Sequence, residues 1–201
     1  MQLLVATRNR HKLKEIREVL AELNLDIVGA TEVPGLPDVE ETGPTIRDNA
    51  IKKAVETAKI AKKLTLADDT GLEVDALKGE PGVRSARFAG GDVTDHENNK
   101  KLLGLLEGVP MDKRSASFRC VIAIADEKGL YDVVEGICNG VILEEERGCN
   151  GFGYDPLFIP DGQVKTFGEM IAEVKNRIGH RGKALQKAWA VLSRYQRERG
   201  G

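Results

Sequence analysis

Two adjacent carboxylates, Asp68 and Asp69, follow the short apolar run Leu64 to Ala67. Successive side chains of an extended chain point to opposite sides, so one carboxylate can face a ligand while the other anchors backbone or a helix end. Carboxylate oxygen is the ligand that Mg²⁺ prefers, and protein-bound Mg²⁺ usually keeps waters and bridges to substrate phosphates. The pair is therefore a candidate metal site, and an Asx-type turn before Gly71 is the alternative.

A second acidic pair, Glu40 and Glu41, lies in the segment 33–44, whose prolines and glycines predict a loop. A charged pair in a loop is usually only solvated by water. It becomes a candidate for the same metal ion if the fold brings it to Asp69. The sequence does not decide between the two glutamates.

A polar, basic loop separates the first apolar run from the first amphipathic segment. Such a loop puts free backbone N–H groups and the positive end of a helix at one point, and this geometry binds phosphate. The Walker sequence GxxxxGK[ST] is absent, and a solvated basic turn is the alternative. Lys12 adds a mobile charge, while Thr7 and Asn9 add neutral hydrogen bonds. The candidate phosphate-binding residues are Thr7, Arg8, Asn9, Arg10, His11 and Lys12.

Further candidates for binding a nucleotide lie on later segments. Lys53 follows Asn49 by one helical turn, so both project on one side of a helix, and Lys53 is either a second phosphate contact or a surface lysine. The segment 151–156 holds two aromatic side chains beside glycines, where they either stack on a base or are buried in a tight turn. Lys175 and the pair His180–Arg181 add donors that suit a phosphate and the carbonyl edge of a base.

Apolar periodicity predicts the elements that must position these residues. Strand–helix units occur together with a hairpin, which indicates an α/β fold with a mixed sheet. A threonine followed three residues later by an acid predicts the helix starts at Thr45, Thr94 and Thr166. We predict strands at 2–6, 64–67, 115–126 and 130–143, and a break in the last near Gly136 or Gly140 is an open alternative. We also predict loops at 78–93 and 148–160, and a final helix after His180–Arg181 with Leu185, Ala188, Leu192 and Tyr195 facing inward.

Composition narrows the function classes. The 201 residues suit one domain, or two lobes on one core. The formal net charge of -2 argues against a general nucleic-acid binder, but a small anionic ligand needs only a local basic cluster. The spacing of the three cysteines fits no zinc or CxxC motif. The N-terminal apolar run is too short for a signal peptide, and no segment approaches the ~20 apolar residues of a membrane span, so we expect a cytoplasmic protein without membrane contact.

Six motifs, taken in order, resemble the inosine triphosphate pyrophosphatase family, whose members act on non-standard purine nucleotides. The resemblance runs from Leu3 to about Leu192. Each motif alone is weak evidence, whereas the ordered set is specific. The motifs are VATRNRHKLKEI, EETGPTIRDNAIKKA, LADDTGLEVDAL, PGVRSARFAG, GFGYDPLF and HRGKAL.

The resemblance implies an elongated, two-lobed mixed β-sheet flanked by helices, formed by residues 1–201 as a single domain. It also implies an active-site cleft between the lobes and a homodimer. The implied reaction is Mg²⁺-dependent hydrolysis of ITP, dITP and XTP to the nucleoside monophosphate and pyrophosphate. Asp69 would be the catalytic proton acceptor and a metal ligand together with Glu40 or Glu41. The substrate would be held by residues 7–12 and by Lys53, Thr70, Phe152, Gly153, Tyr154, Asp155, Lys175, His180 and Arg181.

The chemistry expected is attack of water on the α-phosphate, in which positioning and charge stabilisation do most of the work. Lys12, Lys53 and Lys175 would neutralise the polyphosphate, and Asp69 would take the proton of the water. Two alternatives stay open: a pyrophosphatase of similar fold for pyrimidine or modified nucleotides, and a non-catalytic nucleotide-binding module. The two acidic clusters argue against the module, since a binder of polyphosphate gains little from them without metal chemistry.

Overall fold

The computed structural model describes residues 1–199, which form one six-stranded sheet with helices. The strand order is β2-β1-β3-β4-β5-β6. Strand β1 pairs in parallel with β2 and β3, whereas β5 pairs with β6 in antiparallel fashion, so the sheet is mixed. This confirms the α/β class and the mixed sheet predicted from the sequence. The strands are β1 (Gln2–Val5), β2 (Asp26–Gly29), β3 (Thr65–Val74), β4 (Ser115–Asp126), β5 (Gly129–Ile142) and β6 (Phe158–Pro160).

Two α-helices begin where the threonine caps predict. Thr45 caps α2, and Thr94 with Glu97 forms a complete capping box at α3. Thr166 with Glu169 also forms a capping box, but the turn that it starts is a 3₁₀-helix, Phe167–Glu169. The α-helices are α1 (Arg10–Val19), α2 (Ile46–Ala61), α3 (Asp95–Leu105), α4 (Ala172–Ile178) and α5 (His180–Arg199). None of the helices among residues 1–199 is long and apolar enough to cross a membrane.

The chain divides into two compact units. Unit 1 consists of Met1–Asp69, Cys120–Gly136 and Arg181–Gly201, and unit 2 consists of Thr70–Arg119 and Ile137–His180. Strands β3, β4 and β5 each contribute residues to both units, so neither unit is a continuous stretch of chain. That all 201 residues act as a single domain stays a prediction.

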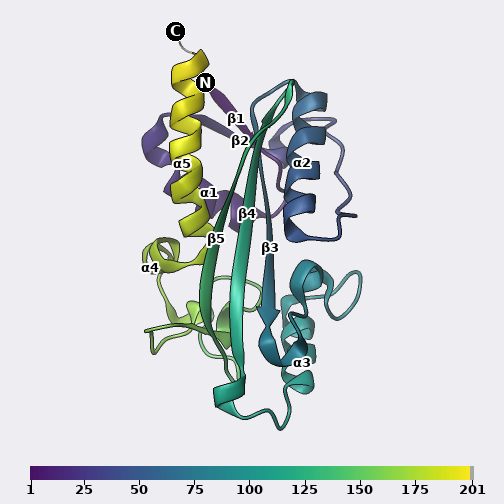
Figure 1. Ribbon diagram of the computed structural model, residues 1–201, viewed down its shortest axis with the longest axis vertical. Coiled ribbons are helices and arrows are strands. Elements are labelled where there is room, and N and C mark those ends of the chain that lie inside the picture. Colours follow the sequence, from purple (N-terminus) through teal and green to yellow (C-terminus); the bar gives the residue numbers. More distant parts are fainter. Residues whose placement is uncertain (200–201) are drawn as a thin grey trace. The chain divides into compact units, whose positions relative to one another are not determined.

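In unit 1, helices cover both faces of the strands. Leu3 and Val5 of β1 pack with Ile16 of α1 and with the inward residues of α5, because alternate strand residues point to one face. Leu4 lies between them in sequence and packs with Leu36 in a separate cluster. Figure 1 shows α2 on the other side of these strands from α5. All four residues predicted to face inward on α5, Leu185, Ala188, Leu192 and Tyr195, are buried.

In unit 2, aromatic side chains form the centre of the core. The rings of Phe118 and Phe158 meet edge to face, with centroids 4.8 Å apart, and Phe167 lies 5.3 Å from Phe158. Leu102 of α3 and Leu106 just after it are fully buried in the same cluster. This packing fixes α3 and the segment around Phe158, which between them flank the loop described below.

The sequence-based prediction was wrong at several elements. Strand β3 is ten residues long and continues through Asp68 and Asp69, where a brief strand ending before them was expected. Aspartate and glycine are rare in strands, but pairing and burial outweigh that local preference here. Strand β5 is unbroken, and segment 78–93 holds a 3₁₀-helix, Gly82–Arg87. The short elements β2, β6 and α4 were not predicted, because three to seven residues carry too little periodicity.

Candidate functional site

In the loop before α1 of unit 1, the side chain of Asn9 caps the N-terminus of the helix. The Oδ1 atom of Asn9 accepts hydrogen bonds from the backbone N–H groups of His11 (2.9 Å) and Lys12 (3.1 Å). The prediction of free N–H groups was therefore wrong for these two residues. Thr7 Oγ1 in turn accepts from Asn9 N at 3.2 Å. The helix end is still positive, and Asn9 is explained as its cap.

The side chains of this loop point to different partners. Lys12 reaches Asp68, as described below. Arg8 donates to the carbonyl of Leu36 at 2.8 Å and lies 3.5 Å from the carboxylate of Asp38, so it is tied to the segment 33–44. Arg10 and His11 are exposed. Of the basic residues predicted to bind phosphate, Lys12 is the one in contact with the acidic pair.

Asp68 is the centre of a buried charge cluster in unit 1. Its Oδ2 atom lies 3.1 Å from Lys12 Nζ and 3.2 Å from Arg181 Nε, and Arg181 Nη1 also pairs with Glu15. Burial alone would raise the pKa of Asp68, but the positive charges of Lys12 and Arg181 outweigh it and hold that pKa well below its usual range. Burial likewise opposes the charge of Arg181, yet Asp68 and Glu15 raise its pKa. Asp68 and Arg181 therefore both stay ionised at neutral pH.

Asp69 lies on the next position of β3 and is also buried. Its charge reaches Lys53 of α2, whose ammonium forms a 2.7 Å ion pair with Glu41 Oε1. Burial lowers the pKa of Lys53, but the carboxylates of Asp68, Glu41 and Asp69 together raise it above its ordinary value. Lys53 is thus affected by carboxylates of both acidic pairs, Glu41 of the second and Asp68 and Asp69 of the first. That Glu40 or Glu41 shares a metal ion with Asp69 stays a prediction.

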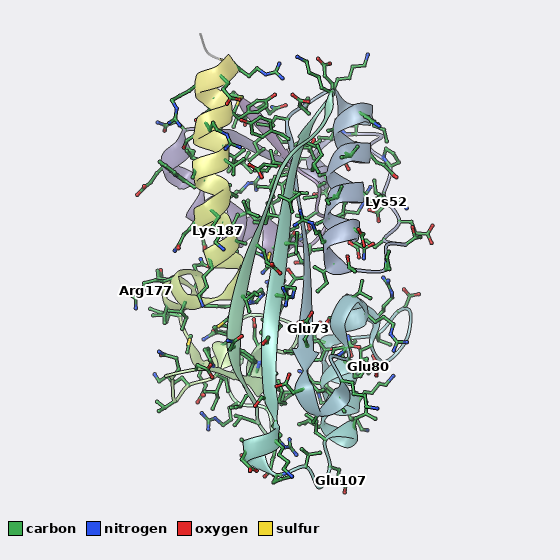
Figure 2. All side chains as sticks on the ribbon, in the orientation of Figure 1. Lys52, Glu73, Glu80, Glu107, Arg177 and Lys187 are labelled. Carbon is green, nitrogen blue, oxygen red and sulfur yellow. The ribbon has the colours of Figure 1, made fainter. Side chains whose placement is uncertain are left out.

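Helix α2 clamps the acidic loop (residues 40–43) with three neighbouring side chains. Lys52 Nζ donates to Glu40 O at 2.9 Å and to Thr42 Oγ1 at 2.8 Å, and Figure 2 labels Lys52 on this helix. Asn49 is fully buried, and its Oδ1 accepts from Gly43 N at 2.7 Å. A Cβ at Gly43 would lie 2.7 Å from that same Oδ1, so the close approach requires glycine. The backbone of the loop is therefore held rigidly while its glutamates project from it.

The donor set in unit 1 suits Mg²⁺ better than a metal that needs a full protein cage. Residues 1–199 contain no group of three or more His, Cys, Asp or Glu side chains that could hold a metal ion by themselves. Mg²⁺ typically takes one or two carboxylates and completes its shell with waters and substrate phosphates. Asp69 and Glu41 both raise the pKa of Lys53, and that Asp69 holds Mg²⁺ together with Glu40 or Glu41 stays a prediction.

The second group of predicted residues lies in unit 2, on the aromatic loop (residues 151–155). Asp155 is 2% exposed, and its Oδ2 accepts from Phe152 N at 2.8 Å and from Lys175 Nζ at 2.6 Å. The Lys175 ammonium lies 4.7 Å from the centroid of the Phe152 ring, a cation–π contact. Gly151 has a φ of +76°, and a Cβ there would lie 2.1 Å from Asp155 Oδ2. Asp155 is therefore the internal anchor of the loop, with Lys175 as its counter-charge.

The other predicted residues of unit 2 are buried or half-buried. Tyr154 is buried, its hydroxyl donates to Ser85 O at 2.9 Å, and burial raises the pKa of that hydroxyl. The imidazole of His180 is stacked on Phe118, with centroids 4.5 Å apart and planes 13° apart. Thr70 is half-buried on β3. Arg181 follows His180 directly but belongs to the charge cluster of unit 1.

Several residues of these groups were missed by reasoning from sequence. Glu15 pairs with Arg181, and its only signal was a position on α1 close to Lys12. Asp95 and Asn99 of α3 bind the aromatic loop at Gly153, and nothing local distinguishes them from ordinary polar helix residues. Phe118 lies in the predicted strand 115–126, and its stacking on His180 depends on a long-range approach that spacing does not reveal.

Comparison with known proteins gives a consistent result over nearly the whole chain. The model of the Ham1 family matches residues 3–191. A protein of Desulforamulus reducens named dITP/XTP pyrophosphatase is 56% identical over 194 residues, which cover 96% of each chain. A Geobacter sulfurreducens protein of the same name is 47% identical over 184 residues, or 92% of each chain.

Solved structures agree with the sequence matches. A HAM1 protein from Coxiella burnetii has a TM-score of 0.87 and 42% identity, covering 96% of this chain and 99% of that one. A Mycobacterium abscessus protein described as a nucleoside-triphosphatase / dITP/XTP pyrophosphatase has a TM-score of 0.76 and 42% identity, covering 94% and 98%. The fold is thus shared with proteins of one family, over nearly the whole length of each chain.

Proposed function

Because the chain belongs to the Ham1 family, we propose that it hydrolyses non-standard purine nucleoside triphosphates such as dITP, XTP and ITP to the monophosphate and pyrophosphate. The observation that carries the proposal is the gathering of Glu41, Asp69 and Lys53 in unit 1. Two acidic positions beside a permanently charged lysine suit a metal-bound polyphosphate. A non-catalytic nucleotide-binding module would gain little from these two carboxylates, because they repel phosphate unless a metal ion is bound.

We assign the polyphosphate to unit 1. Lys12 and Lys53 are ammonium groups already held by Asp68 and Glu41, so they are fixed in place before substrate binds. Asp69 is the general base that takes the proton of the attacking water. When bound, Mg²⁺ would supply charge neutralisation at the phosphates and a more acidic water. Asp68 does not react, because its oxygen is committed to Lys12 and Arg181.

We propose that Glu40, rather than Glu41, is the second metal ligand. The Glu41 carboxylate is engaged by Lys53, whereas the Glu40 side chain is exposed and forms no hydrogen bond or ion pair within residues 1–199. The clamp on Glu40 O by Lys52 fixes the backbone and leaves the carboxylate to reach a cation.

We assign the base to unit 2 and to the residues at the start of α5. Phe152 offers a ring for stacking, and the charge of Lys175 is held near it by Asp155. Donors of His180 and Arg181 suit the 6-carbonyl of hypoxanthine and xanthine, where adenine carries an amino group. A mismatch at a site built for hydrogen bonding can cost up to ~10⁴-fold in kcat/KM, so we expect ITP to be preferred to ATP by a wide margin.

We further propose that the protein works in the cytoplasm as a homodimer, as the resemblance implies. A small, diffusible substrate fits that location, and light scattering of the purified protein would measure the oligomeric state.

The deciding experiment is product analysis. Purified protein with Mg²⁺ should release pyrophosphate and no orthophosphate from ITP, dITP and XTP as the first product. A panel that includes ATP, GTP and pyrimidine triphosphates tests the alternative substrates in the same assay. Orthophosphate as the first product would place cleavage at the terminal phosphate and overturn the proposal, and preference for a pyrimidine nucleotide would favour the alternative.

A further inference from the structure

Helix α3 binds the aromatic loop at Gly153. Its backbone N–H donates to Asp95 Oδ2 at 2.7 Å, and its carbonyl accepts from Asn99 Nδ2 at 3.1 Å. Asp95 and Asn99 are four residues apart, so they lie on one face of the helix, one turn above the other. Both backbone polar atoms of the residue that follows Phe152 are therefore held by one helix.

The side chain of Asn99 is held in one orientation. Asn99 is 2% exposed, and its Nδ2 also donates to Glu146 Oε1 at 2.7 Å. Both partners are acceptors, so the amide can present only its nitrogen to them, and its orientation is determined. A buried, doubly bound amide has few alternative positions, and it transmits the position of α3 to the loop.

Helix α3 is itself anchored independently of the loop. The capping box of Thr94 and Glu97 fixes its first turn, and Leu102 is buried in the core of unit 2. The bond that Phe152 N donates to Asp155 lies within the aromatic loop, whereas Lys175 of α4 and the Tyr154 hydroxyl, which donates to Ser85 O, tie the loop to other parts of unit 2. The contacts from α3 add the two bonds at Gly153, the residue next to Phe152.

We propose that Asn99 and Asp95 are positioning residues for base recognition, which act through Gly153 to set the place of the Phe152 ring. This inference rests on the proposed function. Neither residue touches the base in this scheme. Their loss leaves the phosphate and metal chemistry of unit 1 in place and misplaces the surface on which the purine stacks, so it raises KM and narrows discrimination among purines.

The test compares kcat and KM for ITP and ATP in Asn99→Leu and Asp95→Ala. Asn99→Leu removes both donated bonds with little change of volume, and Asp95→Ala removes an exposed acceptor, so that the second variant folds even where the first does not. We expect each to raise the KM for ITP and to narrow the ITP/ATP ratio of kcat/KM by about fivefold or more, with kcat for ITP changed less than about threefold.

Two matched variants separate positioning from loss of stability. Glu97→Ala removes the capping box of the same helix turn but makes no contact with Gly153, so it should lower the Tm and leave the ITP/ATP ratio unchanged. Asp95→Asn keeps an oxygen that can accept from Gly153 N, so it should restore most of the ratio lost in Asp95→Ala.

The outcomes are distinct. An unchanged ITP/ATP ratio in both Asn99→Leu and Asp95→Ala, or an equal narrowing in Glu97→Ala, would overturn the inference. Failure of the unmodified protein to release pyrophosphate from ITP would instead overturn the proposed function. Calorimetric binding of IMP to Asp95→Ala gives the same comparison without turnover, and weaker binding than in the unmodified protein is expected.

Discussion

Asp68 and Asp69 are neighbours in sequence with different surroundings. Asp68 is fully buried and bound by Lys12 and Arg181, and the charges of both aspartates raise the pKa of Lys53. Successive strand residues face opposite sides, so the two side chains leave β3 in different directions. The sequence predicted that one carboxylate would anchor a helix end, but it could not identify Arg181, 113 residues away, as the partner of Asp68. That Asp69 faces the ligand stays a prediction.

The first prediction concerns Asp69. Asp69→Asn should lower kcat for ITP by at least ~10²-fold, because an amide can neither take a proton from water nor ligate Mg²⁺ as a carboxylate does. The change is nearly isosteric, so the circular dichroism spectrum and Tm should stay close to those of the unmodified protein. Unimpaired turnover of the variant would remove Asp69 from the mechanism.

Asp68→Asn should behave differently, as a stability variant. Leaving Lys12 and Arg181 without their buried partner should cost roughly 3–5 kcal/mol of unfolding free energy at neutral pH. The native pKa of Asp68 is depressed, so its contribution is complete above the unfolded pKa of about 4 and is lost as pH falls through the native value. Urea unfolding should therefore show the largest gap between the two proteins near pH 7 and a shrinking gap below about pH 4.

The two glutamates of the acidic loop give a third prediction, measured as the Mg²⁺ concentration that supports half-maximal rate. Glu40→Gln should raise that concentration about tenfold or more, since it removes a metal ligand. Glu41→Gln should mainly raise the KM for ITP, because it releases Lys53 from its fixed position. The reverse pattern would identify Glu41 as the ligand.

At the scale of elements, α2 and the acidic loop form one unit of structure. Contacts from Asn49, Lys52 and Lys53, which lie within about one turn of α2, bind residues 40–43. The loop has no secondary structure of its own, so its rigidity comes from the helix. Sequence periodicity and the Thr45 cap located the helix correctly, whereas the side-chain clamp depended on how the loop folds back, which local pattern does not encode.

Gly43→Ala should break this clamp. The new methyl group would meet Asn49 Oδ1 at 2.7 Å and Asp48 Cβ at 2.8 Å, so the loop must shift, and we expect a lower Tm together with a raised Mg²⁺ requirement. Gly104→Ala is the matched control: it lies in α3 with nothing within 4 Å, and alanine there should stabilise the protein by about 0.5–1 kcal/mol. Equal Mg²⁺ requirements in both variants would show that the clamp does not matter for the metal.

At the scale of the whole molecule, the α/β class, the mixed sheet and most long elements were predictable, because each carries a strong hydrophobic period or a cap. The candidate residues were also found by type and spacing. What the sequence could not provide is their grouping. Glu15 with Arg181, His180 with Phe118, and Gly153 with Asn99 are contacts between segments far apart in the chain, set by the packing of the sheet and helices.

In the proposed scheme, selectivity between purine bases depends on residues of both units, and two substitutions test it. Phe152→Ala should lower kcat/KM for both ITP and ATP by loss of stacking, worth about 1–3 kcal/mol per base. Arg181→Ala should narrow the ITP/ATP ratio if its donors read the 6-carbonyl. Steady-state kinetics on both substrates measure the two effects. Equal slowing of ITP and ATP in Arg181→Ala would mean that Arg181 acts only through its ion pairs with Asp68 and Glu15.

The interleaving of the two units has a consequence for synthesis of the protein. Unit 1 needs its last segment, which begins at Arg181, and this segment leaves the ribosome after all of unit 2. Until then the nascent chain carries Asp68 and Glu15 without the guanidinium that pairs with them. A stalled or prematurely terminated chain therefore cannot complete the charge cluster, and we expect such fragments to be recognised by proteases as unfolded while the finished chain is not.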